Sequence, residues 1–201
     1  MKTYLLSLWT VFTLLLFQEA NGQSSTNWSN SGIDKAESGD FRGAIQDFNK
    51  AIELEPGFVF AYTNRGKVKM NLGDYRGAIQ DHNKAIELDP DFAGAYFGRA
   101  KVKSRLEDYR GAIQDYSKAI ELEPGFANAY HNRGVAKYYL EDLRGSIHDY
   151  NKVIELVPDD EDAFYSRGIS KLDLGDLEGA CLDWSKAGEL GHEDAYDNIQ
   201  R

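Results

Sequence analysis

Residues 73–90 read GDYRGAIQDHNKAIELDP, and close copies of this stretch recur along the chain every 34 residues. The copy before it is GDFRGAIQDFNKAIELEP at 39–56, and the copy after it is EDYRGAIQDYSKAIELEP at 107–124. Two more divergent copies follow at 141–158 and 175–192. A fixed period of this length indicates repeated supersecondary units, each too small to bury its apolar face alone.

Each unit has the sequence features of two helices. In the second unit, Asp74 stands where an N-cap side chain accepts hydrogen bonds from free backbone amides. Alanine, isoleucine and aromatic residues follow at helical spacing and form one apolar stripe. Pro90 then ends the second helix and turns the chain into the next unit. The pattern therefore predicts an all-α protein made of helix-turn-helix units.

The period and the residues of the units resemble those of the tetratricopeptide repeat (TPR) family. In the second unit the first aromatic, the small residue, the central alanine and the closing proline of the family stand at Tyr62, Gly66, Ala78 and Pro90. Most of these positions are kept in the other units. The resemblance covers residues 25–194 and divides them into five repeats, at 25–58, 59–92, 93–126, 127–160 and 161–194.

This resemblance implies an α-solenoid, in which antiparallel helix pairs stack into a TPR superhelix. Stacking is required because each pair buries its apolar face only against its neighbours. The last such face needs a cover, and residues 195–201 contain Ala195, Tyr196 and Ile199. We therefore expect this segment to form a short C-terminal helix that caps the fifth repeat.

The first 22 residues differ from the rest of the chain. Basic Lys2 precedes an apolar run from Tyr4 to Phe17, and small residues follow at Ala20 and Gly22. This order is typical of a signal peptide. The run is shorter than the roughly 20 residues that a helix needs to cross a bilayer. Residues 1–22 are thus predicted to be cleaved and the protein to be secreted or periplasmic, with membrane attachment only if the segment is retained.

The composition restricts the class of partner. The chain carries 33 Asp and Glu against 23 Lys and Arg, a net charge of -10. Such a surface repels nucleic acid, so no nucleic-acid partner is expected. The one cysteine, Cys181, rules out an internal disulfide in the chain, and stability must come from packing.

Charged residues occupy two first-helix positions that the family usually fills with apolar side chains. They form one row of arginines and one of lysines, and a row of aspartates recurs in the second helices: Arg65, Arg99, Arg133, Arg167; Lys35, Lys69, Lys103, Lys137, Lys171; Asp47, Asp81, Asp115, Asp149, Asp183. The shared period predicts a ladder of ion pairs between helices. Alternatively, the basic rows form a binding strip for an acidic ligand. Ser31 interrupts the arginine row, which predicts that the first repeat is either looser or acts as an N-terminal cap.

Sequence motifs for chemistry are missing. The four histidines form no His-Glu-x-x-His motif, and there is neither a cysteine pair nor a glycine-rich phosphate loop. The acidic run from Asp159 to Asp162 has the composition of a cation site, but it also stands at a helix start, where acids complement the helix dipole. We expect no enzyme activity, no cofactor, no metal and no small-molecule substrate.

The resemblance also implies where a partner would bind. Family members bind peptides or partner helices in a groove lined by the first helices, through residues between the packing positions. Carried onto this chain, that surface consists of Phe60, Asn64, Lys67, Phe97, Lys101, His131, Asn132, Tyr138 and Tyr165. The family's carboxylate clamp is not expected, because Ser29, Ile33, Gly94 and Gly98 replace its binding residues.

Together these features predict a non-catalytic scaffold for protein–protein interaction that is exported and binds a peptide or a partner protein. Two alternatives remain open at this stage. The chain would be a structural spacer, or a non-catalytic subunit of an enzyme complex.

Overall fold

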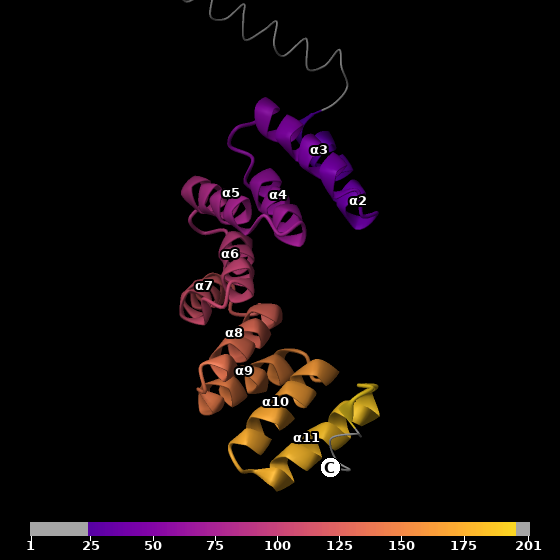
Figure 1. The fold of residues 1–201 in the computed structure, drawn as a ribbon, viewed down its shortest axis with the longest axis vertical. Helices are drawn as coiled ribbons and strands as arrows, with labels where there is room; N and C mark the ends of the chain where they lie inside the picture. The colour runs from indigo at the N-terminus through magenta and orange to yellow at the C-terminus, as the bar shows by residue number, and fades with distance from the viewer. Residues whose placement is uncertain (1–23, 196–201) are drawn as a thin grey trace, which may run out of the picture. The chain divides into compact units, whose positions relative to one another are not determined.

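The computed structural model describes residues 24–195, which contain ten helices and no strand (Figure 1). Every predicted repeat holds two of them. The helices are α2 (Ser25–Glu37), α3 (Phe41–Leu54), α4 (Val59–Asn71), α5 (Tyr75–Leu88), α6 (Ala93–Arg105), α7 (Tyr109–Leu122), α8 (Ala127–Tyr139), α9 (Leu143–Leu156), α10 (Glu161–Asp173) and α11 (Leu177–Leu190). The predicted signal peptide lies outside the described residues.

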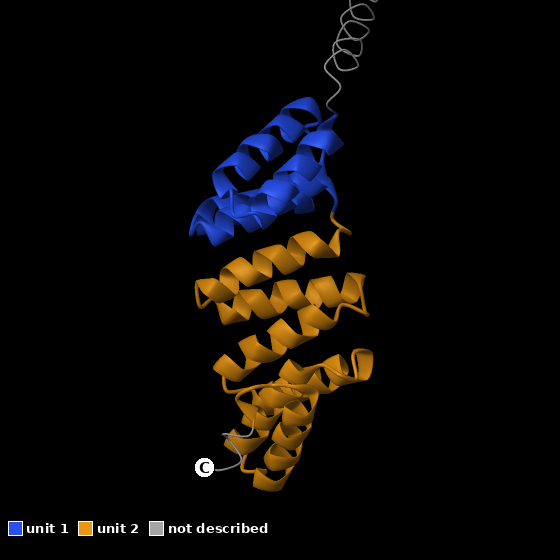
Figure 2. Cartoon of the chain, turned by 90° about the vertical axis from the view of Figure 1, so that its right-hand side faces the viewer, with its two compact units in different colours: residues 1–89 blue, residues 90–201 orange. Residues whose placement is uncertain are grey.

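The helices form two compact units, residues 1–89 and 90–201 (Figure 2). Each first helix packs along the second helix of its own repeat. Within a unit it also packs against the second helix of the preceding repeat, as α4 does on α3, α8 on α7 and α10 on α9. The chain thus has the predicted all-α fold of stacked helix pairs. No helix in the part of the chain described here has both the length and the apolar character needed to cross a membrane.

Tight turns between the paired helices explain why the second helices begin where they do. The side chain of the residue before each second helix caps it, as when the Gly77 amide donates to Asp74 Oδ1 at 2.9 Å. The predicted aspartate N-caps are confirmed in all five second helices. One residue before the cap, the backbone is left-handed, with φ of +80° at Gly73.

Two repeats place a glutamate at this left-handed position, where the other three have glycine. Glu107 has a φ of 60° and Glu141 a φ of 62°. A residue with a Cβ in this conformation costs roughly 1–2 kcal/mol relative to the right-handed region. The two glutamates therefore carry a conformational cost that their glycine counterparts avoid.

The core runs between the two helices of each repeat. Its large members are the inward side chains Phe48, His82, Tyr116, Tyr150 and Trp184, all buried. Small residues on the facing first helix make room for them. At Gly168 an added Cβ would lie 2.6 Å from Trp184 Nε1, so the close approach of α10 and α11 requires a glycine there.

The end of the last repeat is partly covered by the residues after α11. Ala195 is buried against Ala180, Trp184 and Ala187. The imidazole of His192 stacks on the ring of Tyr165, with centroids 3.9 Å apart. Ala195 belongs to the predicted C-terminal cap, and the rest of that segment, 196–201, lies outside the described residues.

Candidate functional site

The charged rows pair across every helix pair, which confirms the predicted ion-pair ladder. In the fourth repeat the Arg133 guanidinium donates two hydrogen bonds to Asp149, from Nε at 2.8 Å and from Nη2 at 2.7 Å. Lys137 Nζ lies 2.8 Å from Asp149 Oδ2, the oxygen that also accepts from Arg133 Nε. Equivalent three-residue groups are centred on Asp81, Asp115 and Asp183.

Each ladder arginine also has partners beyond its aspartate. Arg133 Cζ lies 5.4 Å from the centre of the Tyr130 ring, and its Nη1 donates to Ser117 Oγ in the preceding repeat at 2.9 Å. The Arg133 side chain is only 15% exposed. Because the arginine side chains are largely buried and already bind several groups of the protein, they stabilise the packed helices. This argues against the alternative in which the basic rows form a binding strip for acidic ligands.

The ladder sets the charge state of its aspartates. Burial opposes ionisation of Asp149, whose side chain has no exposed surface. Hydrogen bonds from Arg133 and Lys137 outweigh that burial, so the pKa of the Asp149 carboxyl lies below its ordinary value. The buried carboxylate is therefore ionised at neutral pH and stabilised by its two cations.

The ladder is weaker in the first repeat, where Ser31 stands in the arginine row. Ser31 Oγ donates to Asp47 Oδ2 at 2.6 Å, and Lys35 Nζ lies 2.6 Å from the same oxygen. The Lys35 side chain is 39% exposed. Asp47 therefore has one solvated cation where Asp149 has two shielded ones, and a looser first repeat stays a prediction.

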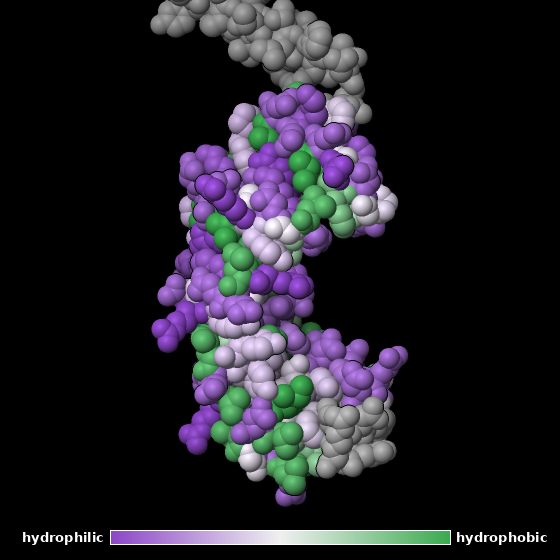
Figure 3. Space-filling model, in the orientation of Figure 1, coloured by the Kyte–Doolittle hydropathy of each residue, from purple (hydrophilic) through white to green (hydrophobic). Residues whose placement is uncertain are grey.

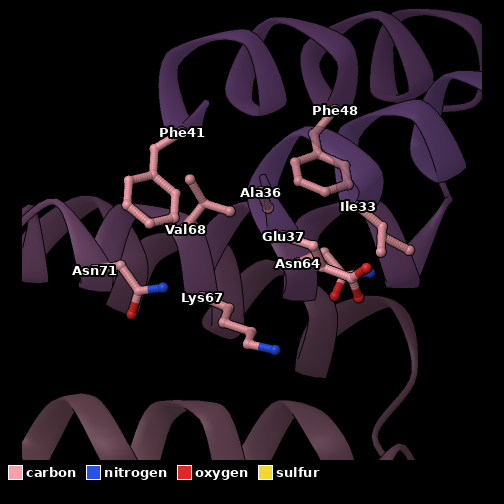
Figure 4. A pocket seen from close by; sticks show the side chains of 9 residues that line it. All are labelled: Ile33, Ala36, Glu37, Phe41, Phe48, Asn64, Lys67, Val68 and Asn71. Atoms are coloured by element: carbon pink, nitrogen blue, oxygen red, sulfur yellow. The ribbon is translucent and has the colours of Figure 1, made fainter. Parts of the chain in front are cut away.

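A pocket of about 260 Å³ lies between α2, α3 and α4 in unit 1 (Figure 4). Apolar side chains form its walls and floor: Ile33, Ala36, Phe41, Phe48 and Val68. Polar side chains line the rest: Glu37, Asn64, Lys67 and Asn71. The pocket thus offers an apolar surface bordered by two carboxamides and two groups of opposite charge.

Two of the three partner-binding residues predicted in unit 1 line this pocket, namely Asn64 and Lys67. The third, Phe60, is 56% exposed at the start of α4, with its ring edge-on to Phe58 at 6.2 Å. The other seven residues that line the pocket, among them Ile33, Glu37 and Asn71, are absent from the predicted set.

The predicted partner-binding residues of α6 and α10 make more contacts within the protein than the sequence indicated. The half-buried Phe97 ring lies 4.7 Å from the Phe126 ring and belongs to the core of unit 2. Lys101 Nζ lies 5.8 Å from the centre of the Phe97 ring. Tyr165 stacks on His192, as described above. These side chains shape the surface of the first helices, but much of their area is already in contact with the protein.

The predicted residues of α8 also have partners within the chain. The His131 imidazole packs edge-on to the Tyr150 ring at 5.4 Å, and burial lowers the pKa of this histidine. Asn132 Nδ2 donates to the Asn128 carbonyl at 2.7 Å. His131 is therefore neutral at physiological pH and adds no positive charge to this surface.

Tyr138, at the end of α8, lies in a second pocket, of about 490 Å³. The pocket is lined by Tyr138, Tyr139, Glu141, Leu143 and Asp173. Tyr138 Oη donates to Asp173 Oδ2 at 2.6 Å. This hydrogen bond and burial raise the pKa of Tyr138 to about 12, so the phenol stays protonated and holds the carboxylate in place. Only Tyr138 among these five residues was predicted from the sequence.

Figure 3 shows one face of the molecule, on which apolar side chains form small groups separated by polar ones. Among residues 24–195, the exposed large apolar side chains are spread over all five repeats. The two pockets therefore carry more information about binding than any broad apolar patch on this face.

Stacked helix pairs with a repeated core and variable first-helix surfaces define the class of α-solenoid scaffolds, which serve protein interaction. Family models described as tetratricopeptide repeat or TPR repeat match residues 59–92, 105–140 and 127–160. The chain belongs to the tetratricopeptide repeat family.

Solved structures with the same fold include MamA and YrrB. A MamA protein structure is 27% identical with a TM-score of 0.72, covering 87% of this chain and 96% of that one. MamA 41-end from Desulfovibrio magneticus RS-1 is 22% identical, with a TM-score of 0.74 and coverages of 83% and 94%. YrrB, described as a TPR protein with an unusual peptide-binding site, is 20% identical, with a TM-score of 0.73 and coverages of 94% and 98%. No curated protein sequence matches the chain significantly.

Proposed function

We propose that this TPR protein is an exported, non-catalytic scaffold that binds an extended peptide segment of a partner protein along its first helices. The pocket between α2, α3 and α4 is the observation that carries the proposal. It joins an apolar floor to side-chain amides on the surface where the family binds its partners. The description of YrrB adds that this fold accommodates a peptide-binding site.

The chemistry of the pocket suits a peptide. Its volume of about 260 Å³ lies below the roughly 300–1,000 Å³ of sites that enclose a drug-sized molecule. One or two apolar side chains fill such a space and remove the pocket walls from water. The carboxamides of Asn64 and Asn71 each offer a donor and an acceptor, which matches the amide and carbonyl of a peptide backbone.

The proposal is tested by selecting peptides from a displayed random library on the full chain and measuring their affinity for variants. Ala36→Trp fills the pocket and is expected to weaken the selected peptides at least tenfold. The matched control is Gln80→Trp, which adds the same ring to an exposed position on α5 and is expected to change nothing. Equal binding by both variants would contradict the pocket. Selection of no peptide at all would favour the structural spacer.

Export is part of the proposal and rests on residues 1–22. The chain is expected in the extracytoplasmic fraction, with a mass that corresponds to loss of the segment ending near Gly22. Intact-mass spectrometry of the recovered protein measures this directly. Recovery of the uncleaved chain from the membrane fraction would show an anchor instead.

The non-catalytic role is supported by the way the repeated polar residues are used. The aspartates cap helices or hold the ladder, and the ladder cations hold the aspartates. Turnover in a screen of hydrolase substrates that is lost with a point mutation in this chain would contradict the proposal.

A further inference from the structure

The pocket in unit 2 combines two carboxylates with aromatic rings. Asp173 comes from the end of α10 and Glu141 from the turn after α8. The hydrogen bond from Tyr138 fixes one oxygen of Asp173 and leaves its second oxygen available to a ligand. Leu143 adds an apolar wall. Such a pocket favours a cation with a flat, weakly hydrated surface.

The aromatic rings of the pocket contact other rings and are accessible. The Tyr139 side chain is 58% exposed. Its ring stacks on Tyr109, with centroids 4.8 Å apart and planes at 8°, and meets the Tyr138 ring edge-on at 5.9 Å. Rings held in this way attract cations through their faces and lose little conformational entropy when a ligand binds.

The backbone of Glu141 has an unusual conformation. This residue holds a φ of 62° at the turn position where Gly39, Gly73 and Gly175 stand in other repeats. Glu107 has the same conformation in the third repeat, so the backbone by itself does not mark a site. In the fourth repeat the side chain of Glu141 is a carboxylate that lines the pocket.

The charge of the surrounding repeat adds a long-range attraction. Residues 159–195 contain eleven Asp and Glu and only three Lys and Arg. All three cations lie beside carboxylates within the repeat: Arg167 and Lys171 on Asp183, and Lys186 near Glu189. Most of the net charge of -10 is therefore concentrated in residues 159–195, next to the pocket. A field of this sign draws a basic ligand toward the site.

We propose that the pocket formed by Tyr138, Tyr139, Glu141, Leu143 and Asp173 binds an arginine side chain of the partner segment, with apolar residues beside that arginine. The guanidinium stacks on the exposed Tyr139 ring while its edge pairs with the carboxylates, a combination that a lysine ammonium does not match. Exposed Leu172 and Leu174 on either side of Asp173 receive the neighbouring apolar side chains. This inference rests on the scaffold role proposed above, but not on the pocket of unit 1.

The test uses the full chain and two blocked heptapeptides, Gly-Ser-Leu-Arg-Leu-Ser-Gly and the same peptide with citrulline in place of arginine. Citrulline keeps the shape of arginine and removes its charge. Binding is followed by chemical-shift titration of the tyrosine ring signals. The arginine peptide is expected to bind saturably, at least fivefold more tightly than the citrulline peptide, and to weaken as salt is added.

Two glutamate variants separate binding from folding. Glu141→Gly is expected to raise the melting temperature by a few degrees, because it removes the conformational cost, and to weaken the arginine peptide at least fivefold. Glu107→Gly removes the same charge and the same backbone cost one repeat earlier. Glu107 acts on Tyr109, whose ring stacks on Tyr139, so this variant is expected to raise the melting temperature similarly and to weaken the arginine peptide less than Glu141→Gly does.

Three results would overturn the proposal: no saturable shift with the arginine peptide, equal affinity for the citrulline peptide, or unchanged affinity in Glu141→Gly. Ala36→Trp is expected to leave this titration unchanged. Failure of the unit 1 pocket and failure of the arginine pocket are therefore distinguishable.

Discussion

The first and fourth repeats follow the same 34-residue pattern, but their ladder aspartates have different partners. Asp47 in the first repeat is bound by Ser31 and by the solvated Lys35. Asp149 in the fourth is fully buried and receives Arg133 and Lys137. The comparison teaches that the repeat pattern determines which positions are in contact. A single substitution at one of these positions determines how much the contact contributes to stability.

The largest expected difference between the two repeats comes from removing the aspartate charge. Asp149→Asn leaves two shielded cations without a counter-charge and is expected to cost about 3–5 kcal/mol of unfolding free energy. Asp47→Asn leaves only Ser31 and the solvated Lys35, and we expect about 1 kcal/mol. Urea unfolding followed by circular dichroism measures both. Equal losses of unfolding free energy would show that the ion pairs at Asp47 and Asp149 are equivalent and would contradict the comparison.

A smaller difference is expected where the first helix approaches the inward aromatic residue. Gly168→Ala places a methyl group against the Trp184 indole and is expected to cost about 1–3 kcal/mol. Gly134→Ala places its Cβ 3.1 Å from Tyr150 Cε1. There the gain in helix propensity, up to about 1 kcal/mol, offsets a mild contact. Thermal melts of the two variants check the order, and a larger loss for Gly134→Ala would contradict it.

Restoring the arginine row in the first repeat is expected to bring it closer to the fourth. Ser31→Arg places a guanidinium in the ladder position facing Asp47, with Trp28 in the place that Tyr130 has beside Arg133. We expect a gain of about 1 kcal/mol, because hydrogen bonds between charged groups are stronger than the present hydroxyl contact. The shift of the urea midpoint measures it. A lower midpoint would mean that the first repeat has no room for the side chain.

Acid provides the finest test of the ladder. Because the pKa of Asp149 is lowered in the folded state, its contribution is present above the pKa of the unfolded chain and is lost as the pH falls through the folded value. The difference in stability between the parent chain and Asp149→Asn should therefore stay constant at neutral pH and narrow below about pH 4. A difference that widens in acid would show that the paired charge is not the cause.

The sequence was sufficient for the features that repeat. The aspartate caps and the ladder were predicted because residues 16 apart, such as Arg133 and Asp149, recur in four of the five units at a spacing that brings two paired helices face to face. The all-α stacking followed from the same period. These features depend on local geometry that one repeat already contains.

The pockets were not predictable in the same way, because they depend on residues that differ between repeats. One position of the repeat is filled by Asn71, Arg105, Tyr139 and Asp173 in successive units. The neighbouring side chains decide which of these residues line a pocket. Phe97 was predicted as a groove anchor, but its ring packs against Phe126, which the sequence pattern did not indicate. The replacement of glycine by Glu141 was visible in the alignment of the repeats, but Glu107 shows the same replacement, so this signal alone does not locate the second pocket.

The Nη1 atoms of the ladder arginines have a consequence for the way the protein unfolds. Arg65 Nη1 donates to Asn49, Arg133 Nη1 to Ser117 and Arg167 Nη1 to Asn151, each in the preceding repeat. Each of these arginines thus links the two helices of its own repeat and also links that repeat to the preceding one. Unfolding one repeat therefore breaks a hydrogen bond to the adjacent repeat. In a linear array this coupling sets how many repeats melt together. Amide exchange within a unit should therefore be lost in blocks longer than 34 residues, as a cooperative transition rather than fraying repeat by repeat.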